Sequence, residues 1–383
     1  MDLQDSVGSR IHSYGRLIFR SESIVETMTV DEILQLRLYS QNITNPGKNP
    51  TDILSSLVAI QAQDPGQSKF ALGSRLLDGK ESEINRMIEK RKIIRTWLLR
   101  GTLHFVSAKD IHWILDLISE RIFAKLATYQ KSLNLNSKML SETESIILKR
   151  LSGKKELTRA ELFTYIEEKN ISTKENRGSI ILINAALKQM ICLGKDQGKQ
   201  ETYTLLSDWV EKPKPISREK ALGDLAKRYF ISRGPAGLQD FIWWSGLTLT
   251  EARLGLEKAK PFLREETVSG QTYWMSKKEN KTAGRTDSNE YLFLAGFDEY
   301  IIGYADRNLS LDPKYSELVI QKNAIFKPTI LKRGNVIGTW SKTETKNGLE
   351  INVSPFFQWK NSDKKEVDRQ KSEIIRFWSG RGK

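Results

Sequence analysis

The sequence contains very little cysteine and histidine. Cys192 is the single cysteine among 383 residues, and the only histidines are His12, His104 and His112. One cysteine excludes an intramolecular disulfide and is typical of proteins from a reducing, cytoplasmic compartment. A zinc site needs several Cys or His ligands at recognised spacings, and none occurs here. The sequence therefore predicts no disulfide, no metal centre and no cofactor.

Long hydrophobic runs are absent as well. A membrane-spanning helix needs about 20 consecutive apolar residues, and no segment approaches that length. The first 26 residues mix charged and apolar side chains and lack the apolar centre of a signal peptide. With 39% hydrophobic and 28% charged residues, the composition is that of an ordinary globular protein. We therefore expect a cytoplasmic protein without a membrane partner, and the length predicts about two to four domains.

Positive charge is the main compositional feature. The formal net charge is +14. A strong positive field attracts polyanions, and nucleic acid is the commonest of these in the cytoplasm. The alternative is a soluble basic protein with no polyanionic partner, since net charge also serves solubility.

Two glutamines in the motif Gln61-Ala62-Gln63 are the first candidate site residues. Apolar residues before the motif have helical spacing, and Pro65 disfavours helical geometry at Asp64, so a helix should end close to the glutamines. In extended backbone, side chains at i and i+2 point to the same side and could converge on one target. A carboxamide does not titrate, so it can orient a substrate or a water without exchanging a proton. The alternative is a polar helix end.

A pattern of helices followed by a β-hairpin, which is the winged-helix plan, is repeated along the chain. The hairpins are expected around Gly101, Gly198 and Gly270, and the first predicted helix has a capping box of Thr29 and Glu32. Helices are predicted at 28–42, 158–169, 177–193, 221–232, 238–245 and 248–258. After an N-terminal extension, 1–27, we therefore expect three winged-helix units at 28–135, 136–212 and 213–285.

The pattern changes after Tyr291 to short strands with alternating bulk. Arg333-Gly334-Asn335 and Lys346-Asn347-Gly348 are expected turns between them. The last predicted element is a helix over 365–378. The sequence therefore predicts a small β-barrel with a C-terminal helix at 286–383, or alternatively a curled sheet closed by that helix, and an α+β fold overall.

Several short strings follow one another in a characteristic order. They are Gln61-Ala62-Gln63-Asp64-Pro65, Arg95-Thr96-Trp97 through Arg100-Gly101-Thr102-Leu103-His104, Gly234-Pro235-Ala236 to Trp243-Trp244-Ser245-Gly246, and Gly296-Phe297-Asp298-Glu299-Tyr300 to Gly338-Thr339-Trp340. Together they resemble the winged-helix DNA glycosylases of the AlkZ type, a bacterial family. The resemblance covers about residues 29 to 345.

The resemblance implies a DNA repair enzyme that hydrolyses the N-glycosidic bond of N7-alkylpurines and unhooks interstrand crosslinks. A Gln-x-Gln motif carries catalysis in this branch, which maps onto Gln61 and Gln63; a sister branch has Gln-x-Asp. The implied partner is double-stranded DNA with alkylated bases, bound by a monomer at the nucleoid. No obvious catalytic lysine is present, although Lys69 lies nearby, so a monofunctional glycosylase is expected rather than a lyase.

The residue types suit this chemistry. An N7-alkylated purine is cationic and already a good leaving group, so positioning a water is the main task. Asp64 is a candidate electrostatic stabiliser or base, or alternatively a turn residue before Pro65. Arg95, Arg100 and His104 around the first hairpin are expected to contact DNA phosphates. The alternatives are a solvated hairpin tip for Arg100 and a packed strand residue for His104.

Other notable residues have a structural interpretation. Trp97 is expected to pack in the core, with stacking on DNA as the alternative, and Trp243 and Trp244 are expected to pack on their helix neighbours. Asp298 and Glu299 are expected to form a buried structural pairing, with a catalytic role as the alternative. Because bulky adducts do not fit a tight pocket, we expect the glutamines to line an open groove on a basic concave surface. The alternative function is a non-enzymatic winged-helix DNA-binding protein such as a transcriptional regulator. The sequence disfavours it, because it predicts three winged units and shows no obvious effector pocket and no dimerisation heptad.

Overall fold

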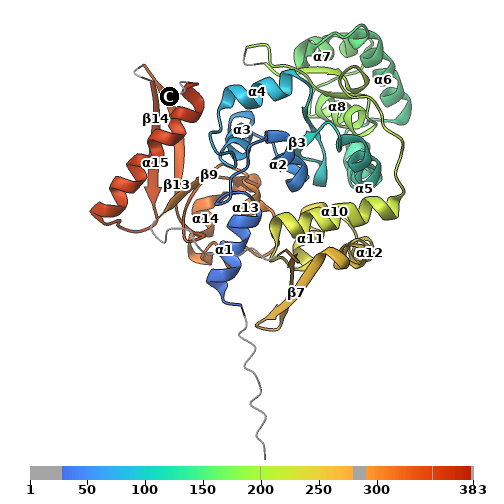
Figure 1. The fold of residues 1–383 in the computed structure, drawn as a ribbon. Helices are drawn as coiled ribbons and strands as arrows, with labels where there is room; N and C mark the ends of the chain where they lie inside the picture. Colours follow the sequence, from blue (N-terminus) through green and yellow to red (C-terminus); the bar gives the residue numbers. More distant parts are fainter. Residues whose placement is uncertain (1–27, 199, 279–289, 347, 381–383) are drawn as a thin grey trace, which may run out of the picture.

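The computed structural model describes residues 28–198, 200–278, 290–346 and 348–380. Helices surround a central six-stranded sheet, and a second, four-stranded sheet carries the C-terminal helix (Figure 1). The fold is mixed α and β, as predicted. The predicted N-terminal extension, 1–27, lies outside the described residues.

The glutamine motif begins on a short edge strand. α1 (Val30–Ser40) starts at the predicted capping box, and α2 (Pro50–Leu57) ends where Val58 takes a positive φ of 68°. β1 (Ala59–Gln61) follows directly, and α3 (Pro65–Gly73) begins after the motif. The helix therefore ends close to the glutamines, and the backbone at Gln61 is extended, as expected.

The central sheet joins the first two predicted hairpins. Its strands run in the order β1-β3-β2-β5-β6-β4, and Arg95 on β2 pairs with Leu193 on β5. The remaining strands are β2 (Ile93–Trp97), β3 (Leu103–Ser107), β4 (Leu157–Thr158), β5 (Ile191–Leu193) and β6 (Thr202–Leu205). The two hairpins are thus parts of one sheet and do not project as separate wings.

The helices that flank this sheet include six from residues 81–209. They are α4 (Glu81–Glu89), α5 (Ile111–Ser132), α6 (Ser137–Leu151), α7 (Arg159–Glu167), α8 (Arg177–Leu187) and α9 (Leu206–Trp209). The predicted helix at 177–193 was wrong at its C-terminal end, because Gln189 takes a positive φ of 60° and the next residues form β5. Among the helices of the described residues, none has both the length and the apolar character to cross a membrane.

The third predicted group of elements forms as expected. α10 (Arg218–Arg233), α11 (Leu238–Ser245) and α12 (Leu249–Ala259) precede the hairpin of β7 (Leu263–Val268) and β8 (Gln271–Ser276). One buried apolar cluster contains Val106, Leu187 and Trp244, which come from the three predicted units. The units therefore share a core, and their division into domains stays a prediction.

The C-terminal strands form an open sheet, so the predicted barrel was wrong. The order is β14-β13-β12-β9, which leaves two edges. Four strands are few for closure into a barrel, and α15 covers the apolar face instead, where Trp378 packs on Trp340 of β13; Phe377 packs on Phe70 of α3. The strands are β9 (Tyr291–Leu294), β12 (Thr329–Lys332), β13 (Asn335–Thr345) and β14 (Gly348–Pro355), and the helix is α15 (Asn361–Ser379).

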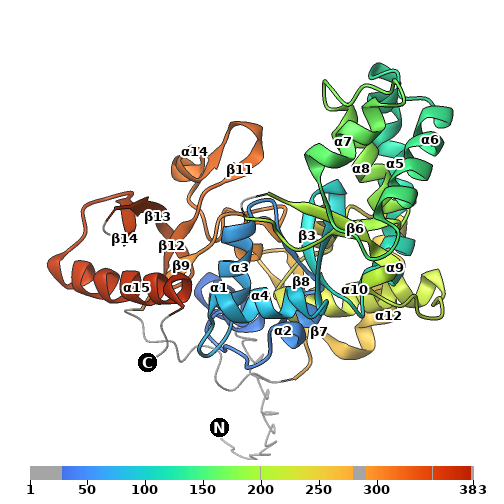
Figure 2. The ribbon, with the colours of Figure 1, turned by 90° about the horizontal axis from the view of Figure 1, so that it is seen from above.

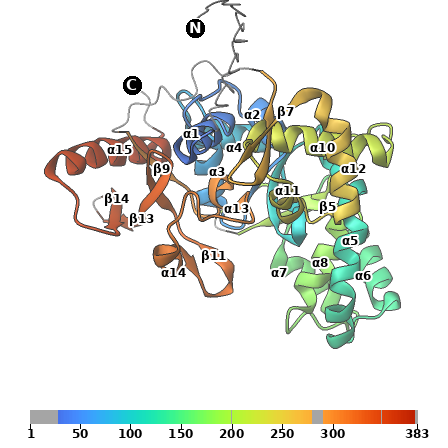
Figure 3. The same cartoon turned by 90° about the horizontal axis from the view of Figure 1, so that it is seen from below.

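Several short elements lie between β9 and β12 in the chain or connect the longer ones. They are α13 (Glu299–Ile302), α14 (Ser316–Val319), β10 (Ile320–Gln321) and β11 (Ile325–Phe326), and 3₁₀ turns lie at Leu99–Gly101, Lys260–Phe262, Pro313–Tyr315 and Lys322–Ala324. α13 sits between α3 and α11 (Figures 1 and 3). The α7–α8 region and the β10–β11 hairpin with α14 project to the same side (Figures 2 and 3). The predicted basic concave surface stays a prediction.

Candidate active site

The strand register places the candidate residues on opposite faces of the central sheet. Gln61 on β1 pairs with His104 on β3, whereas Arg95 on β2 pairs with Phe105. Paired residues share a face and successive residues alternate, so Gln61 and His104 face one side and Arg95 the other. The structure therefore groups Gln61 with His104 and separates Arg95 from both.

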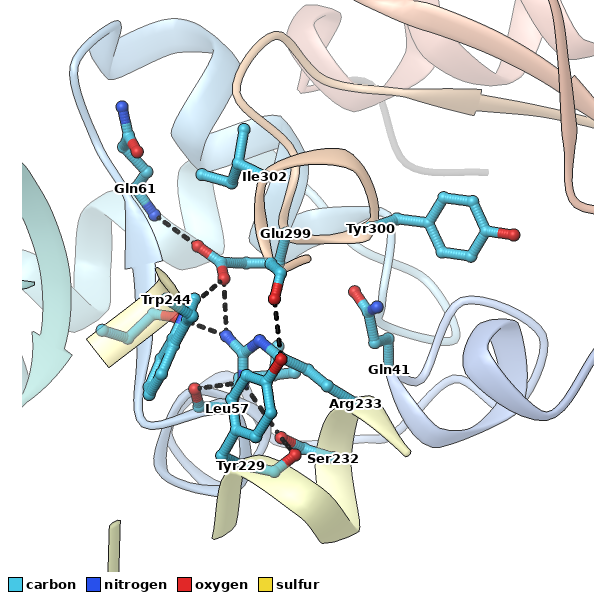
Figure 4. Close-up of polar contacts among 12 residues, drawn as sticks. Gln41, Leu57, Gln61, Tyr229, Ser232, Arg233, Trp244, Glu299, Tyr300 and Ile302 are labelled. Atoms are coloured by element: carbon cyan, nitrogen blue, oxygen red, sulfur yellow. Dashed lines mark hydrogen bonds and ion pairs between the residues drawn. The ribbon is translucent and has the colours of Figure 1, made fainter. Parts of the chain in front are cut away.

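Gln61 is held at its backbone and at its side chain. Its main-chain N–H donates to Oε1 of Glu299 at 3.1 Å, and its Oε1 accepts from Nη2 of Arg100 at 3.3 Å. Nη1 of Arg100 donates to the carbonyl of Trp244, whose indole N–H donates to Oε2 of Glu299 at 2.9 Å. These four residues thus form a closed ring of hydrogen bonds. Figure 4 shows the side chain of Gln61 directed away from the Glu299 carboxylate.

Glu299 is a buried anion neutralised by Arg233. Neither side chain is exposed, and Oε2 of Glu299 accepts from Nη2 of Arg233 at 2.6 Å (Figure 4). Burial alone would raise the pKa of Glu299, but the charge and hydrogen bond of Arg233 outweigh it and hold the pKa below its ordinary value. Arg233 also donates to the carbonyls of Leu57 and Ala59, which flank the start of β1. The pair therefore fixes the strand that carries Gln61.

The neighbouring carboxylate forms a second buried pair. Both oxygens of Asp298 accept from Arg75, at 2.7 and 2.9 Å, and neither side chain is exposed. Arg75 also donates to the carbonyl of Gln41 at 3.0 Å. The predicted buried ion pairing of Asp298 and Glu299 is confirmed.

Arg100 and His104 lie beside Gln61, and they differ in their exposure to solvent. Arg100, at a positive φ of 58°, is half-buried, and burial lowers the pKa of its guanidinium from the ordinary value. His104 is fully buried. Its Nδ1 lies 2.9 Å from the carbonyl of Thr102, so Nδ1 carries the proton and Nε2 is an acceptor without a partner among the described residues. Burial and the charge of Arg100 lower the pKa of His104 to about 4, so this imidazole is neutral at pH 7.

Arg95 has partners that differ from those expected. It is 7% exposed, and it donates to the carbonyl of Ala62 at 3.0 Å and to Glu201 at 2.5 Å. These contacts link Ala62, the middle residue of the glutamine motif, to the second hairpin. Neither Arg95 nor His104 is exposed for a phosphate contact in this conformation, and their role in DNA binding stays a prediction.

Gln63 and Asp64 are exposed at the end of β1. Oδ1 of Asp64 accepts from the backbone N–H of Gln67 at 3.0 Å, which makes Asp64 the N-cap of α3. This geometry agrees with the turn interpretation, while an electrostatic role stays a prediction. Gln61 itself is 9% exposed, so the motif runs from a nearly buried to an open position.

The tryptophans divide between core and surface. Trp244 is fully buried and Trp97 stacks on Tyr203, as expected, but Trp243 is 46% exposed, so its predicted packing role was wrong. Its indole N–H donates to the carbonyl of Ile302 at 3.3 Å, and Arg307 lies 5.3 Å from its ring. No cluster of His, Cys, Asp and Glu within the described ranges could hold a metal ion.

Sequence reasoning missed the partners that position the motif. Arg233 and Trp244 were not connected to Gln61, because no local pattern links residues that far apart. The unusual acidic pair Asp298-Glu299 in a basic protein was the one available signal.

Comparison with known proteins agrees with these motifs. The family model for AlkZ-like DNA glycosylases matches residues 54–377. An interstrand DNA cross-link repair glycosylase of Streptomyces sahachiroi is 24% identical over 342 residues, which are 85% of this chain and 90% of that protein. The solved structure of the Streptomyces sahachiroi DNA glycosylase AlkZ has a similar fold, with a TM-score of 0.77 and 21% identity, over 92% of this chain and 97% of that one. The chain therefore belongs to the AlkZ-like DNA glycosylase family.

Proposed function

We propose that this protein is a monofunctional DNA N-glycosylase that hydrolyses the bond between deoxyribose and an N7-alkylated purine. In this proposal it acts as a monomer on double-stranded DNA, and Gln61 and Gln63 hold the water that attacks the anomeric carbon. A relative named for interstrand crosslink repair supports extending the substrates to crosslinked purines, unhooked on one strand at a time.

The observation that carries the proposal is the double anchoring of Gln61. Glu299 holds its backbone and Arg100 its side chain, next to an exposed Gln63. Fixing groups in this way lowers the barrier by prior ordering, by up to about 7–11 kcal/mol in the ideal limit. A cationic purine is already a good leaving group, so a neutral amide that only positions groups is sufficient for this substrate.

The surroundings support hydrolysis without a covalent enzyme intermediate. Lys69, the nearest lysine noted in the sequence, is only partly exposed and pairs with Glu81 at 3.5 Å. A Schiff-base lyase needs a free, unprotonated amine, which an ion pair disfavours. Glu299 is buried and neutralised, so it acts on the reaction through the position of Gln61.

An oligonucleotide duplex with a single N7-methylguanine tests the proposal. The duplex is incubated with wild type and with the double variant Gln61→Ala/Gln63→Ala, and then treated with mild alkali to cleave abasic sites. We expect strand cleavage with wild type and none above background with the variant. Tight binding by wild type without an abasic product would instead support a DNA-binding regulator.

A further inference from the structure

Arg100 was expected to contact DNA phosphates, but its guanidinium is directed into the protein. Nη1 donates to the carbonyl of Trp244, and Nη2 donates to Oε1 of Gln61 at 3.3 Å. The side chain is half-buried and passes beside Gly246 at the end of α11, where an added Cβ would lie 3.5 Å from Cγ of Arg100. Both of its terminal nitrogens therefore already donate within the site.

This contact determines which end of the Gln61 carboxamide faces outward. A guanidinium has donors and no acceptor, so only the oxygen of the carboxamide can face it favourably. A flipped amide would set NH2 against the N–H groups of Arg100. The oxygen therefore points into the protein, and the NH2 group is the free end; in the described part of the chain it has no acceptor.

The opposite orientation is available to Gln63. It is exposed beyond the last paired residue of β1, where the N–H of Ala62 still donates to the carbonyl of Leu103 at 2.7 Å. Within the described ranges no guanidinium is hydrogen-bonded to its oxygen, and Arg95, on the neighbouring part of the sheet, donates to the carbonyl of Ala62 and to Glu201. The two glutamines therefore differ in the group that each can offer.

We propose that Arg100 is a positioning residue that fixes Gln61 as a hydrogen-bond donor to the substrate, so that the oxygen of Gln63 holds the nucleophilic water. This inference rests on the proposed glycosylase function. A water that attacks carbon keeps its lone pair free and donates its hydrogens, so it needs an acceptor, which Gln63 supplies. The NH2 group of Gln61 is suited to an acceptor on the sugar or the departing purine.

Paired substitutions at the two glutamines test the division of roles. Glu is nearly isosteric with Gln but has no NH2 group, whereas Met has similar length and no polar group. We expect Gln61→Glu to be as slow as Gln61→Met in single-turnover base release from the N7-methylguanine duplex. Gln63→Glu should exceed Gln63→Met by at least about tenfold. Activity of Gln61→Glu near that of wild type would overturn the inference.

Arg100→Met separates positioning from phosphate contact. We expect the single-turnover rate constant at saturating enzyme to fall at least about tenfold, with the DNA Kd and its salt dependence unchanged. A phosphate contact would instead weaken binding and reduce the slope of log K against log salt by about one. That second result, with an unchanged rate constant, would overturn the proposal.

A double-mutant cycle and a matched control complete the test. In the background of Gln61→Met, Arg100→Met should cause no further loss, because both act through one group; independent, multiplying losses would contradict the proposal. Lys125 is exposed and also lies beside Gly246, so Lys125→Met removes a nearby charge and should retain the wild-type rate constant. If Arg100→Met does not fold, Arg100→Lys is measured instead. Its ammonium still donates a hydrogen bond, so we expect a single-turnover rate constant below that of wild type but above background. Absence of base release by wild type would instead reject the proposed function itself.

Discussion

The main-chain N–H of Gln61 donates a 3.1 Å hydrogen bond to the carboxylate of Glu299, although 238 positions of sequence separate them. Glu299 lies on α13, and its other oxygen accepts from Arg233 on α10 and Trp244 on α11. The candidate site is thus built where three distant parts of the chain meet. The position of Gln61 therefore depends on Glu299, whose buried negative charge is neutralised by Arg233.

Removing the charge of Glu299 should destabilise the fold strongly. Glu299→Gln leaves Arg233 as an unpaired cation with no exposed surface, and such a break costs about 3–5 kcal/mol. The free energy of unfolding, measured with urea, checks this. Asp224→Asn is a control, since Asp224 pairs with Lys220 at the surface and should cost less than about 1 kcal/mol. Equal losses in the two variants would contradict the role of the buried pair.

Stability should fall as the pH decreases from 6.5 toward 4, because of His104. Burial, with the charge of Arg100, lowers the pKa of His104 to about 4, against about 6.5 in the unfolded chain. Between these values the unfolded state binds the proton and the folded state does not, so protonation favours unfolding. From pH 7.5 to pH 5 the contribution is about 2 kcal/mol.

Urea unfolding of wild type and His104→Leu at the two pH values isolates this contribution. The variant should lose less stability on acidification. Glu299 and Arg233 also face His104, but the lowered pKa of Glu299 places its own titration below this window. Parallel pH profiles for both proteins would contradict the prediction, because they would mean that folding does not lower the pKa of His104.

Trp243→Ala should weaken DNA binding with little change in stability. The ring is 46% exposed and is held by Ile302 and Arg307 close to the residues that contact Gln61. Stacking of a base on an aromatic side chain contributes about 1–3 kcal/mol, so we expect an increase in Kd of about fivefold or more. Fluorescence anisotropy with a labelled duplex measures it. An unchanged Kd would show that this tryptophan does not meet DNA.

Cys192 should resist thiol reagents in the native protein. It is fully buried on β5, and burial raises the pKa of its thiol far above the ordinary value, so the reactive thiolate is scarce. We expect less than about 5% reaction with a chromogenic disulfide within an hour under native conditions, and complete reaction in denaturant. Fast labelling of the native protein would mean that β5 opens readily.

Much of the local structure could be predicted from the sequence, because its causes are local. The capping boxes at Thr29 and Thr248 define helix starts through side chains three residues apart, and the turn at Ser269-Gly270 takes the positive φ values that favour glycine. The extended backbone at Asp64, directly before Pro65, is another local effect. These features depend on neighbours in the chain.

The assembly of the site could not be predicted in the same way. Pairing of β2 with β5 merges two expected wings into one sheet, and no periodicity reveals which strand edges will meet. Arg95 and Arg100 look equivalent in the sequence. Arg95 pairs with Phe105 on β3, however, and therefore lies on the face of the sheet opposite to Gln61 and His104. The exposure of Trp243 beside the buried Trp244 depends on where α13 packs.

Asp298 and Glu299, adjacent in sequence, neutralise two arginines, Arg75 and Arg233, that come from earlier parts of the chain. Until α13 has been synthesised and docked, both guanidiniums lack these counterions, and the main-chain N–H of Gln61 lacks its acceptor on Glu299. A chain shortened before residue 298 should therefore be inert as well as unstable. On the proposed function, we expect catalytic competence to arise only once the last quarter of the chain, which contains α13, has been made.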